Sequence, residues 1–257
     1  MKTTVLDGFT IRGTDGELGT IDQFYFDDET WAIRWAVVQT GGWLGSRNVL
    51  ISPRSFLPPD WQAKALDVSL TKEQVKNSPD IDTHQPVSRQ HEAQFLGYYG
   101  YPTYWGGGYA AGLSFPPLPP PNPPVHKPAT EQDTHLRSTK TVTGYSIQAL
   151  DGEIGHLDGF LLDDQTWAIR FLEVATRNWW PGKKVLVSPG WVERVSWEKS
   201  KVYAGLSREA IQTAPEYAES MPITRAYETQ LYAHYGRQAY WLSESETQNK
   251  STAGTAR

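Results

Sequence analysis

The stretch 27–34 reads DDETWAIR and the stretch 163–170 reads DDQTWAIR, so that a single change separates the two phrases. Offsetting the chain against itself by 136 positions, the separation of Trp31 from Trp167, extends this match without a gap from about residue 4 to about residue 105. A period this long indicates two copies of a globular domain of roughly 100 residues, and not a solenoid. Eight of the eleven Trp residues are partners in this alignment: Trp31/Trp167, Trp43/Trp179, Trp61/Trp197 and Trp105/Trp241.

The repeat sets the expected boundaries. We predict a first domain over residues 1–105, a Gly- and Pro-rich linker over 106–138, a second domain over 139–242 and a disordered polar tail over 243–257. The linker turns Pro-rich between residues 116 and 128, and prolines at this density favour an extended polyproline II spacer. A docking site for a proline-recognition groove is the alternative interpretation of the same segment.

Short strands with closely spaced turns dominate each copy. Asp15-Gly16 and Asp151-Gly152 are turn pairs, because glycine tolerates a positive φ. We expect strands over 4–12, 17–26, 31–40 and 49–52 and over the matching residues of the second copy, with a further strand or hairpin over 61–69 and 195–204. Thr71 and Gln74 fit a capping box that begins a short helix, Ser207 offers the matching cap, and a second helix is expected from about Ser88 and Thr224. The expected fold is mainly β with short helices (α+β): two tandem small antiparallel barrels, each followed by a helical segment.

The composition of the chain argues against several classes of function. The net charge is −5 with a pI near 5.7, and no dense basic patch occurs, so we expect no nucleic-acid partner. The chain has no cysteine, which removes disulfides, thiolate zinc sites and cysteine nucleophiles. No window approaches 18 consecutive apolar residues and the first ten lack a signal-peptide core, so we expect no membrane association and a cytoplasmic location.

Arg34 and Arg170 lie in the middle of expected strands, between apolar neighbours. A guanidinium in such a place needs a partner, because burial of an unpaired charge costs several kcal/mol. We expect structural ion pairs between these arginines and nearby acids, and we expect these pairs to fix the register of the strands in each barrel. The candidates are Asp22, Asp27 and Asp28 in the first copy and Asp158, Asp163 and Asp164 in the second. The same acids could form a divalent-cation site, but their spacing differs from that of a calcium loop and favours turn formation.

No strong catalytic signature is present. None of the six His residues has a His partner in the other copy, and the chain has no HExxH, GxSxG or phosphate-loop motif. We therefore expect no catalytic, cofactor-binding or metal-binding residues. Aromatic residues at the loop tips, namely Trp43, Trp179 and Trp180, are the candidate contacts with a partner.

Several of these segments carry a family likeness. The run from Asp15-Gly16-Glu17 through DDETWAIR, the corner VLISP at 49–53 (VLVSP at 185–189) and the short helix after it resemble the PRC-barrel domain. That family is named for the photosynthetic reaction-centre H subunit and includes the C-terminal domain of a ribosome-maturation factor. The resemblance covers most of residues 1–80 and 137–216. It implies a small antiparallel barrel that serves as a protein-binding or assembly module without shared catalytic residues. The H subunit's transmembrane helix and the ribosome factor's other domain have no match here, so neither process follows.

The sequence thus predicts a non-enzymatic adaptor or scaffold with protein partners. We expect the two barrels to pair with approximate two-fold symmetry, and homo-oligomers are an open possibility. The alternative is a small-molecule or ion sensor that uses the groove between the barrels. An enzyme is the third hypothesis, for which His156 and His234 would be the residues to inspect.

Overall fold

A computed structural model describes residues 6–79, 81, 89–102, 136–176, 183–218 and 222–242. These residues form two compact units. The first unit comprises the described residues between Thr3 and Thr141 together with Asp164–Ala168. The second unit comprises the described residues of Val142–Asp163 and those from Ile169 onward. Each unit is described by itself below.

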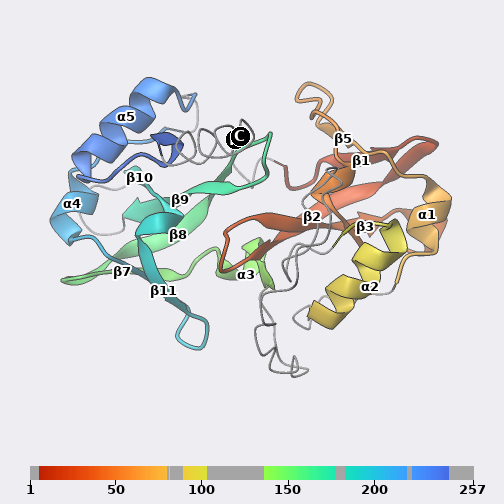
Figure 1. Ribbon diagram of the computed structural model, residues 1–257, viewed down its shortest axis with the longest axis horizontal. Coiled ribbons are helices and arrows are strands. Elements are labelled where there is room, and N and C mark those ends of the chain that lie inside the picture. Colours follow the sequence, from red (N-terminus) through yellow and green to blue (C-terminus); the bar gives the residue numbers. More distant parts are fainter. Residues whose placement is uncertain are drawn as a thin grey trace, which may run out of the picture. The chain divides into compact units, whose positions relative to one another are not determined.

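A six-stranded sheet forms the first unit (Figure 1). Strands β1 (Thr10–Gly13), β2 (Gly16–Asp27), β3 (Ile33–Thr40) and β4 (Asn48–Ile51) pair in succession as antiparallel neighbours. Strand β5 (Ala65–Asp67) then pairs with β1 in parallel, and β6 (Leu136–Ser138) pairs with β2. The sharp β1–β2 turn needs Gly16, whose φ of 129° is strained for any residue with a side chain.

The second unit repeats the order of strands β1 to β5, but among the described residues it has no counterpart of β6 and adds a strand, β11 (Val192–Ser196), beside the counterpart of β5. Its strands are β7 (Ser146–Ala149), β8 (Gly152–Leu162), β9 (Ile169–Thr176), β10 (Lys184–Val187), β11 and β12 (Lys201–Ala204). The sheet order is β10-β9-β8-β7-β12-β11, and β12 pairs with β7 in parallel as β5 does with β1. The internal duplication is therefore present at the level of strand order.

The expected fold class, mainly β with short helices, is confirmed, but the expectation of purely antiparallel strands is wrong for one pair in each sheet. After β4 and the one-turn helix η3 (Pro53–Ser55), the chain returns to the opposite edge of the sheet before it forms β5. A strand that arrives by such a crossover can run parallel to its neighbour, whereas a tight hairpin enforces an antiparallel pair. No pairing among the described strands closes either sheet.

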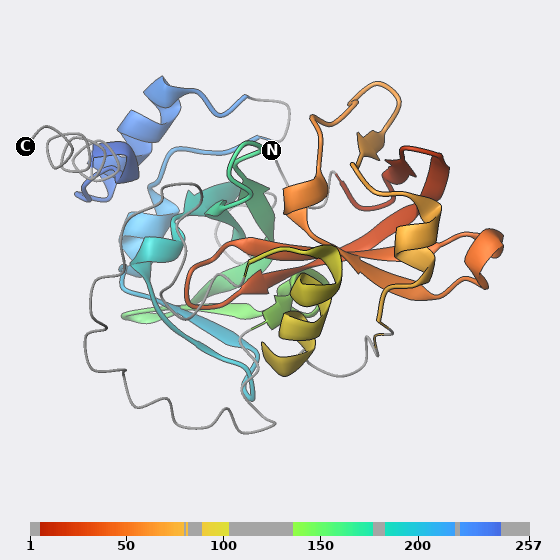
Figure 2. The same cartoon turned by 45° about the vertical axis from the view of Figure 1, so that its right-hand side comes forward.

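Short helices follow the strands as the sequence predicts. Helix α1 (Lys72–Lys76) begins at Thr71 with the predicted capping box, and α4 (Arg208–Gln212) begins at Ser207, whose side chain accepts a hydrogen bond from the Ala210 backbone. Helix α2 (Arg89–Tyr99) packs against the strands of the first unit (Figure 1 and Figure 2). Its Phe95 and Leu96 join a core that includes Trp35, Val37 and Leu50. Helix α5 (Arg225–His234) is its counterpart, capped by Thr224.

The segment after residue 135 differs from the expectation. Residues 136–138, which the sequence assigned to the linker, form β6, and the strand expected from residue 140 is instead helix α3 (Thr139–Val142). The hydroxyl of buried Thr139 accepts a hydrogen bond from the Phe24 backbone, which ties this segment to β2. The rest of the predicted linker and the tail lie outside the described residues.

Candidate functional site

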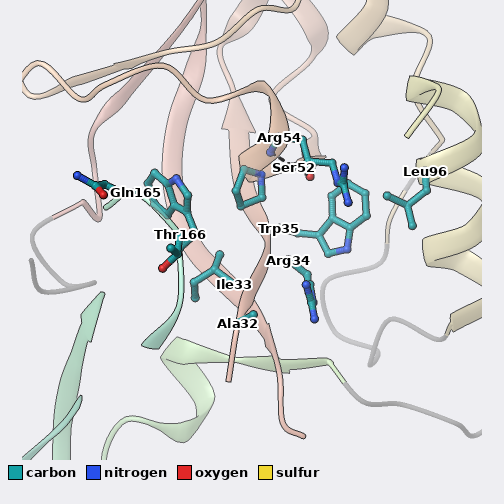
Figure 3. Close-up of a pocket in the computed structure, with 11 residues that line it drawn as sticks. Ala32, Ile33, Arg34, Trp35, Ser52, Arg54, Leu96, Gln165 and Thr166 are labelled. Carbon is teal, nitrogen blue, oxygen red and sulfur yellow. Dashed lines mark hydrogen bonds between the residues drawn. The ribbon is translucent and has the colours of Figure 1, made fainter. Parts of the chain in front are cut away.

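The first unit contains a pocket of about 260 Å³. Figure 3 shows Leu96 at one end and Gln165 and Thr166 at the other, with Trp35, Ser52 and Arg54 between them. The lining comes from β3, η3, α2 and the segment Asp164–Ala168, all within this unit. The lining residues are Ala32, Ile33, Arg34, Trp35, Ser52, Pro53, Arg54, Leu96, Gln165, Thr166 and Trp167.

The repeated phrase builds the turn before β3. The Asp27 carboxylate accepts hydrogen bonds from the backbone N–H groups of Glu29 and Thr30, at 3.1 and 2.9 Å. The Trp31 N–H then donates to the Asp27 carbonyl at 2.8 Å. This is the turn chemistry expected of a short acidic side chain. It fixes where β3 begins, and therefore where Arg34 and Trp35 enter the pocket wall.

Arg34 is held by the same turn. Its guanidinium lies 3.7 Å from the Asp27 carboxylate and donates to the Thr30 hydroxyl at 3.0 Å, and the Arg34 side chain is 21% exposed. The other two candidate acids have cations of their own, since Asp28 pairs with Arg137 and Asp22 with Lys140. The sequence could not supply these two pairings, because Arg137 lies within the segment that was expected to be linker and Lys140 lies just after it.

The second unit repeats the arginine pair. Arg170 lies 3.1 Å from Asp163, the counterpart of Asp27. Asp158 instead pairs with Lys184 at 2.6 Å. No ion pair of Asp164 occurs among the residues that the structure covers, and that residue belongs to the first unit. The structure therefore brings each predicted arginine to one of its proposed acids, although the role of these pairs in strand register stays a prediction.

Trp43 folds back onto its own unit. It lies in the one-turn helix η2 (Gly42–Leu44), is half-buried, and donates from Nε1 to the Leu18 carbonyl at 2.9 Å. Lys72 Nζ sits 5.7 Å from its ring centroid. Trp179 and Trp180 lie outside the described residues. A more exposed aromatic, which the sequence reasoning did not single out, is Trp61, at 44% exposure.

Two tryptophans form rigid walls of the pocket. Trp35 is 1% exposed, and its Nε1 donates at 2.9 Å to Glu92, which is 1% exposed as well. Trp167 packs edge-on against Phe56 at 4.8 Å, and its carbonyl accepts from the Ile33 N–H at 2.9 Å. With the indole N–H of Trp35 already engaged, this side chain offers mainly an apolar face.

Arg54 adds a second cation to the pocket. Its side chain is exposed, and the described part of the chain places no carboxylate within ion-pair distance of it. Burial raises the pKa of the neighbouring Tyr101, while a hydrogen bond with Ser55 and the Arg54 charge act in the opposite direction. Tyr101 thus stays a neutral phenol at physiological pH. The pocket combines an apolar floor with two arginines, which suits an apolar or aromatic group next to negative charge.

Across the described ranges, no group of three or more His, Asp or Glu residues is placed to hold a metal ion. Within the same ranges, no helix has the length and apolar character needed to cross a bilayer.

Part of the first copy matches a known family. Residues 4–75 match the family model of the PRC-barrel domain. No second match of this model occurs in the chain, although the second unit repeats the order of strands β1 to β5. No curated protein matches the sequence. The PRC-barrel match therefore covers the part of the first copy from β1 to α1, and we identify this part as a PRC-barrel domain.

Proposed function

We propose that the protein is a non-enzymatic binding module that recognises other proteins through the pocket of its first unit. The observation that carries this proposal is the pocket's lining, in which Trp35 and Trp167 face the same space as Arg34 and Arg54. Tryptophan and arginine are the residues most enriched at the energetic centres of protein interfaces. PRC-barrel domains often serve in protein interaction or assembly, which agrees with this reading.

The pocket's size favours a protein side chain over a metabolite. Small-molecule sites usually enclose about 300–1,000 Å³. The volume here, about 260 Å³, lies below that range and suits one or two side chains of a docked segment. The ligand-sensor hypothesis placed its site in a groove between the barrels, and it stays a sequence-based prediction that a thermal-shift screen of metabolites and divalent ions would test.

The charges point to an acidic segment. The protein as a whole has a net charge of −5, so its overall charge does not attract an acidic segment. The attraction has to be local, and the exposed cation Arg54 supplies it. A peptide with a carboxylate beside an apolar side chain would gain a charge-assisted hydrogen bond together with burial of apolar area.

An array of synthetic peptides tests the function. The full chain is probed against peptides that vary in charge and in apolar content, and the Arg54→Glu variant is probed beside it. We expect the wild-type chain to select acidic peptides with large apolar residues, and Arg54→Glu to weaken that binding about tenfold, as for loss of one charge-assisted contact.

Arg194→Glu serves as the matched control, because Arg194 is an exposed arginine of β11 and its reversal changes the net charge equally. Equal losses in both variants would mean that only overall charge matters. Absence of any selected peptide would refute the proposed function.

A further inference from the structure

The second unit has a site that corresponds to the pocket of the first unit, and aromatic side chains of the second unit occupy this site. The Arg170 guanidinium lies 4.2 Å from the ring centroid of Tyr240, and Tyr232 contacts both Tyr240 and Trp241 at centroid distances of 6.1 and 5.4 Å. The Tyr240 hydroxyl donates to Glu228 at 3.0 Å. Within the second unit, a tyrosine from the segment after α5 thus covers Arg170, and the adjacent Trp241 packs beside it against Tyr232 and Arg225.

The corresponding residues of the first unit line its pocket. Arg34 occupies the place of Arg170 on the equivalent strand, and Leu96 occupies the place of Tyr232 on the equivalent helix. Both face the pocket. Two of the side chains that receive the Tyr-Trp pair in the second unit therefore have counterparts that border open volume in the first.

Two differences between the pocket of the first unit and the corresponding site of the second unit favour a ligand from outside the chain. Trp35 stands where the second unit has Phe171, and it engages the buried Glu92, the counterpart of the Glu228 that binds the Tyr240 hydroxyl. Arg54 stands where the second unit has Gly190, which adds a cation at the first site alone. In the first unit, the carboxylate that corresponds to the acceptor of the Tyr240 hydroxyl is therefore engaged by Trp35, and Arg54 adds a positive charge that the second unit lacks at the corresponding position.

Resting on the proposed function, we infer that the pocket of the first unit binds a Tyr-Trp pair flanked by acidic residues, presented by a partner protein. The Arg34 guanidinium stacks on the aromatic ring, as Arg170 does on Tyr240, and Leu96 packs against its edge. Arg54 meets the flanking carboxylate. Arginine is suited to this position because its planar cation can stack on a ring and hydrogen-bond at its rim at once.

The probe is a fluorescein-labelled peptide with the sequence RQAYWLSESE, which is that of residues 237–246, and binding to the full chain is followed by fluorescence anisotropy. We expect saturable binding that is lost when the peptide's Tyr and Trp are both replaced by Ala. Arg34→Ala should weaken binding about 3- to 30-fold, the range of a cation–π contact between exposed and desolvated sites.

Since Arg34 also pairs with Asp27, thermal unfolding must show that each variant is folded. Arg34→Lys keeps the charge but loses the planar stack, so we expect it to weaken the peptide nearly as much as Arg34→Ala. Full binding by a folded Arg34→Lys variant would overturn the stacking contact. Arg194→Ala is the control that should leave the affinity unchanged.

The remaining outcomes separate this inference from the proposed function. Selection of aliphatic acidic peptides, with no binding of the Tyr-Trp probe, would overturn the inference and leave the function standing. Failure of every peptide would remove both. The chain's own Tyr104-Trp105 aligns with Tyr240-Trp241, so the double variant Tyr104→Ala/Trp105→Ala is tested as well. If the probe bound to this double variant but not to the wild-type chain, the inference that a partner protein supplies the Tyr-Trp pair would be overturned.

Discussion

The two units share a strand order but differ in what they bury beneath it. In the second unit, Glu173 on β9 is fully buried and pairs with Lys184 at 2.7 Å, and Lys184 also reaches Asp158. The first unit has Val37 and Asn48 at the positions of Glu173 and Lys184. One backbone topology therefore accommodates a buried valine at this position in one copy and a buried glutamate with a charged network in the other.

A second difference lies under the helices. In the first unit, the indole N–H of Trp35 donates to the buried Glu92 of α2. In the second unit, the side chain of Phe171 has no N–H to donate, and Glu228 binds Arg225 and Tyr240 instead. The carboxylate keeps its place in both copies while its donor changes. Among the described residues, Arg34 of the first unit borders a pocket, whereas its counterpart Arg170 in the second unit is covered by Tyr240.

The largest effect is expected from Lys184→Met. Removing this cation leaves the carboxylate of Glu173 buried without its 2.7 Å partner, and breaking a buried pair in this way costs about 3 kcal/mol. The double variant Glu173→Val/Lys184→Asn installs the residues of the first unit and should recover most of this loss. Urea unfolding of the full chain measures both. A double variant no more stable than Lys184→Met would show that the two copies cannot exchange these residues.

A smaller effect is expected from Trp35→Phe, which gives the first unit the residue of the second. Glu92 then loses the indole N–H, and the loss of a hydrogen bond to a buried charged group costs about 2 kcal/mol. Phe171→Trp, the reverse change in the second unit, is the matched comparison. An unchanged urea midpoint for Trp35→Phe would mean that the indole–carboxylate bond adds nothing to the stability of the first unit.

The smallest effect is a pH dependence that only the first copy can show. Asp7, which aligns with Thr143, is exposed, yet partial desolvation and the nearby Asp22 charge raise its pKa from 3.8 to about 6, with Lys140 opposing. Because the unfolded chain releases this proton at lower pH than the folded chain does, Asp7 reduces stability as the pH rises from about 4 through about 6.

Asp7→Asn removes this decline. The variant should match the wild type near pH 4 and exceed it at pH 7 by no more than about 1 kcal/mol, since water screens an exposed charge. Urea midpoints at both pH values, compared between variant and wild type, measure the difference. A gain of the same size at both values would exclude titration of Asp7 as its cause.

The duplication, the mainly β class, the helix caps at Thr71, Ser207 and Thr224, and the family of the first copy could all be predicted from the sequence. These features depend on local patterns: turn glycines, alternation of apolar residues, and a hydroxyl that accepts from a backbone N–H three residues ahead. The pocket could not be predicted, because it joins β3 and α2 to the segment Asp164–Ala168, which begins 65 residues after the end of α2.

The pairing of acids with bases shows the same division. The sequence determined that Arg34 and Arg170 need carboxylates and named the acids close to them, because an arginine between apolar neighbours in an expected strand is recognisable from residue types and their order. Only the tertiary structure decided that Asp28 belongs to Arg137 and Asp158 to Lys184. Those choices depend on which distant segments the sheet brings within 4 Å. Packing, which is driven by the burial of apolar surface, sets long-range proximity of this kind. No short stretch of sequence shows which distant segments packing will bring together.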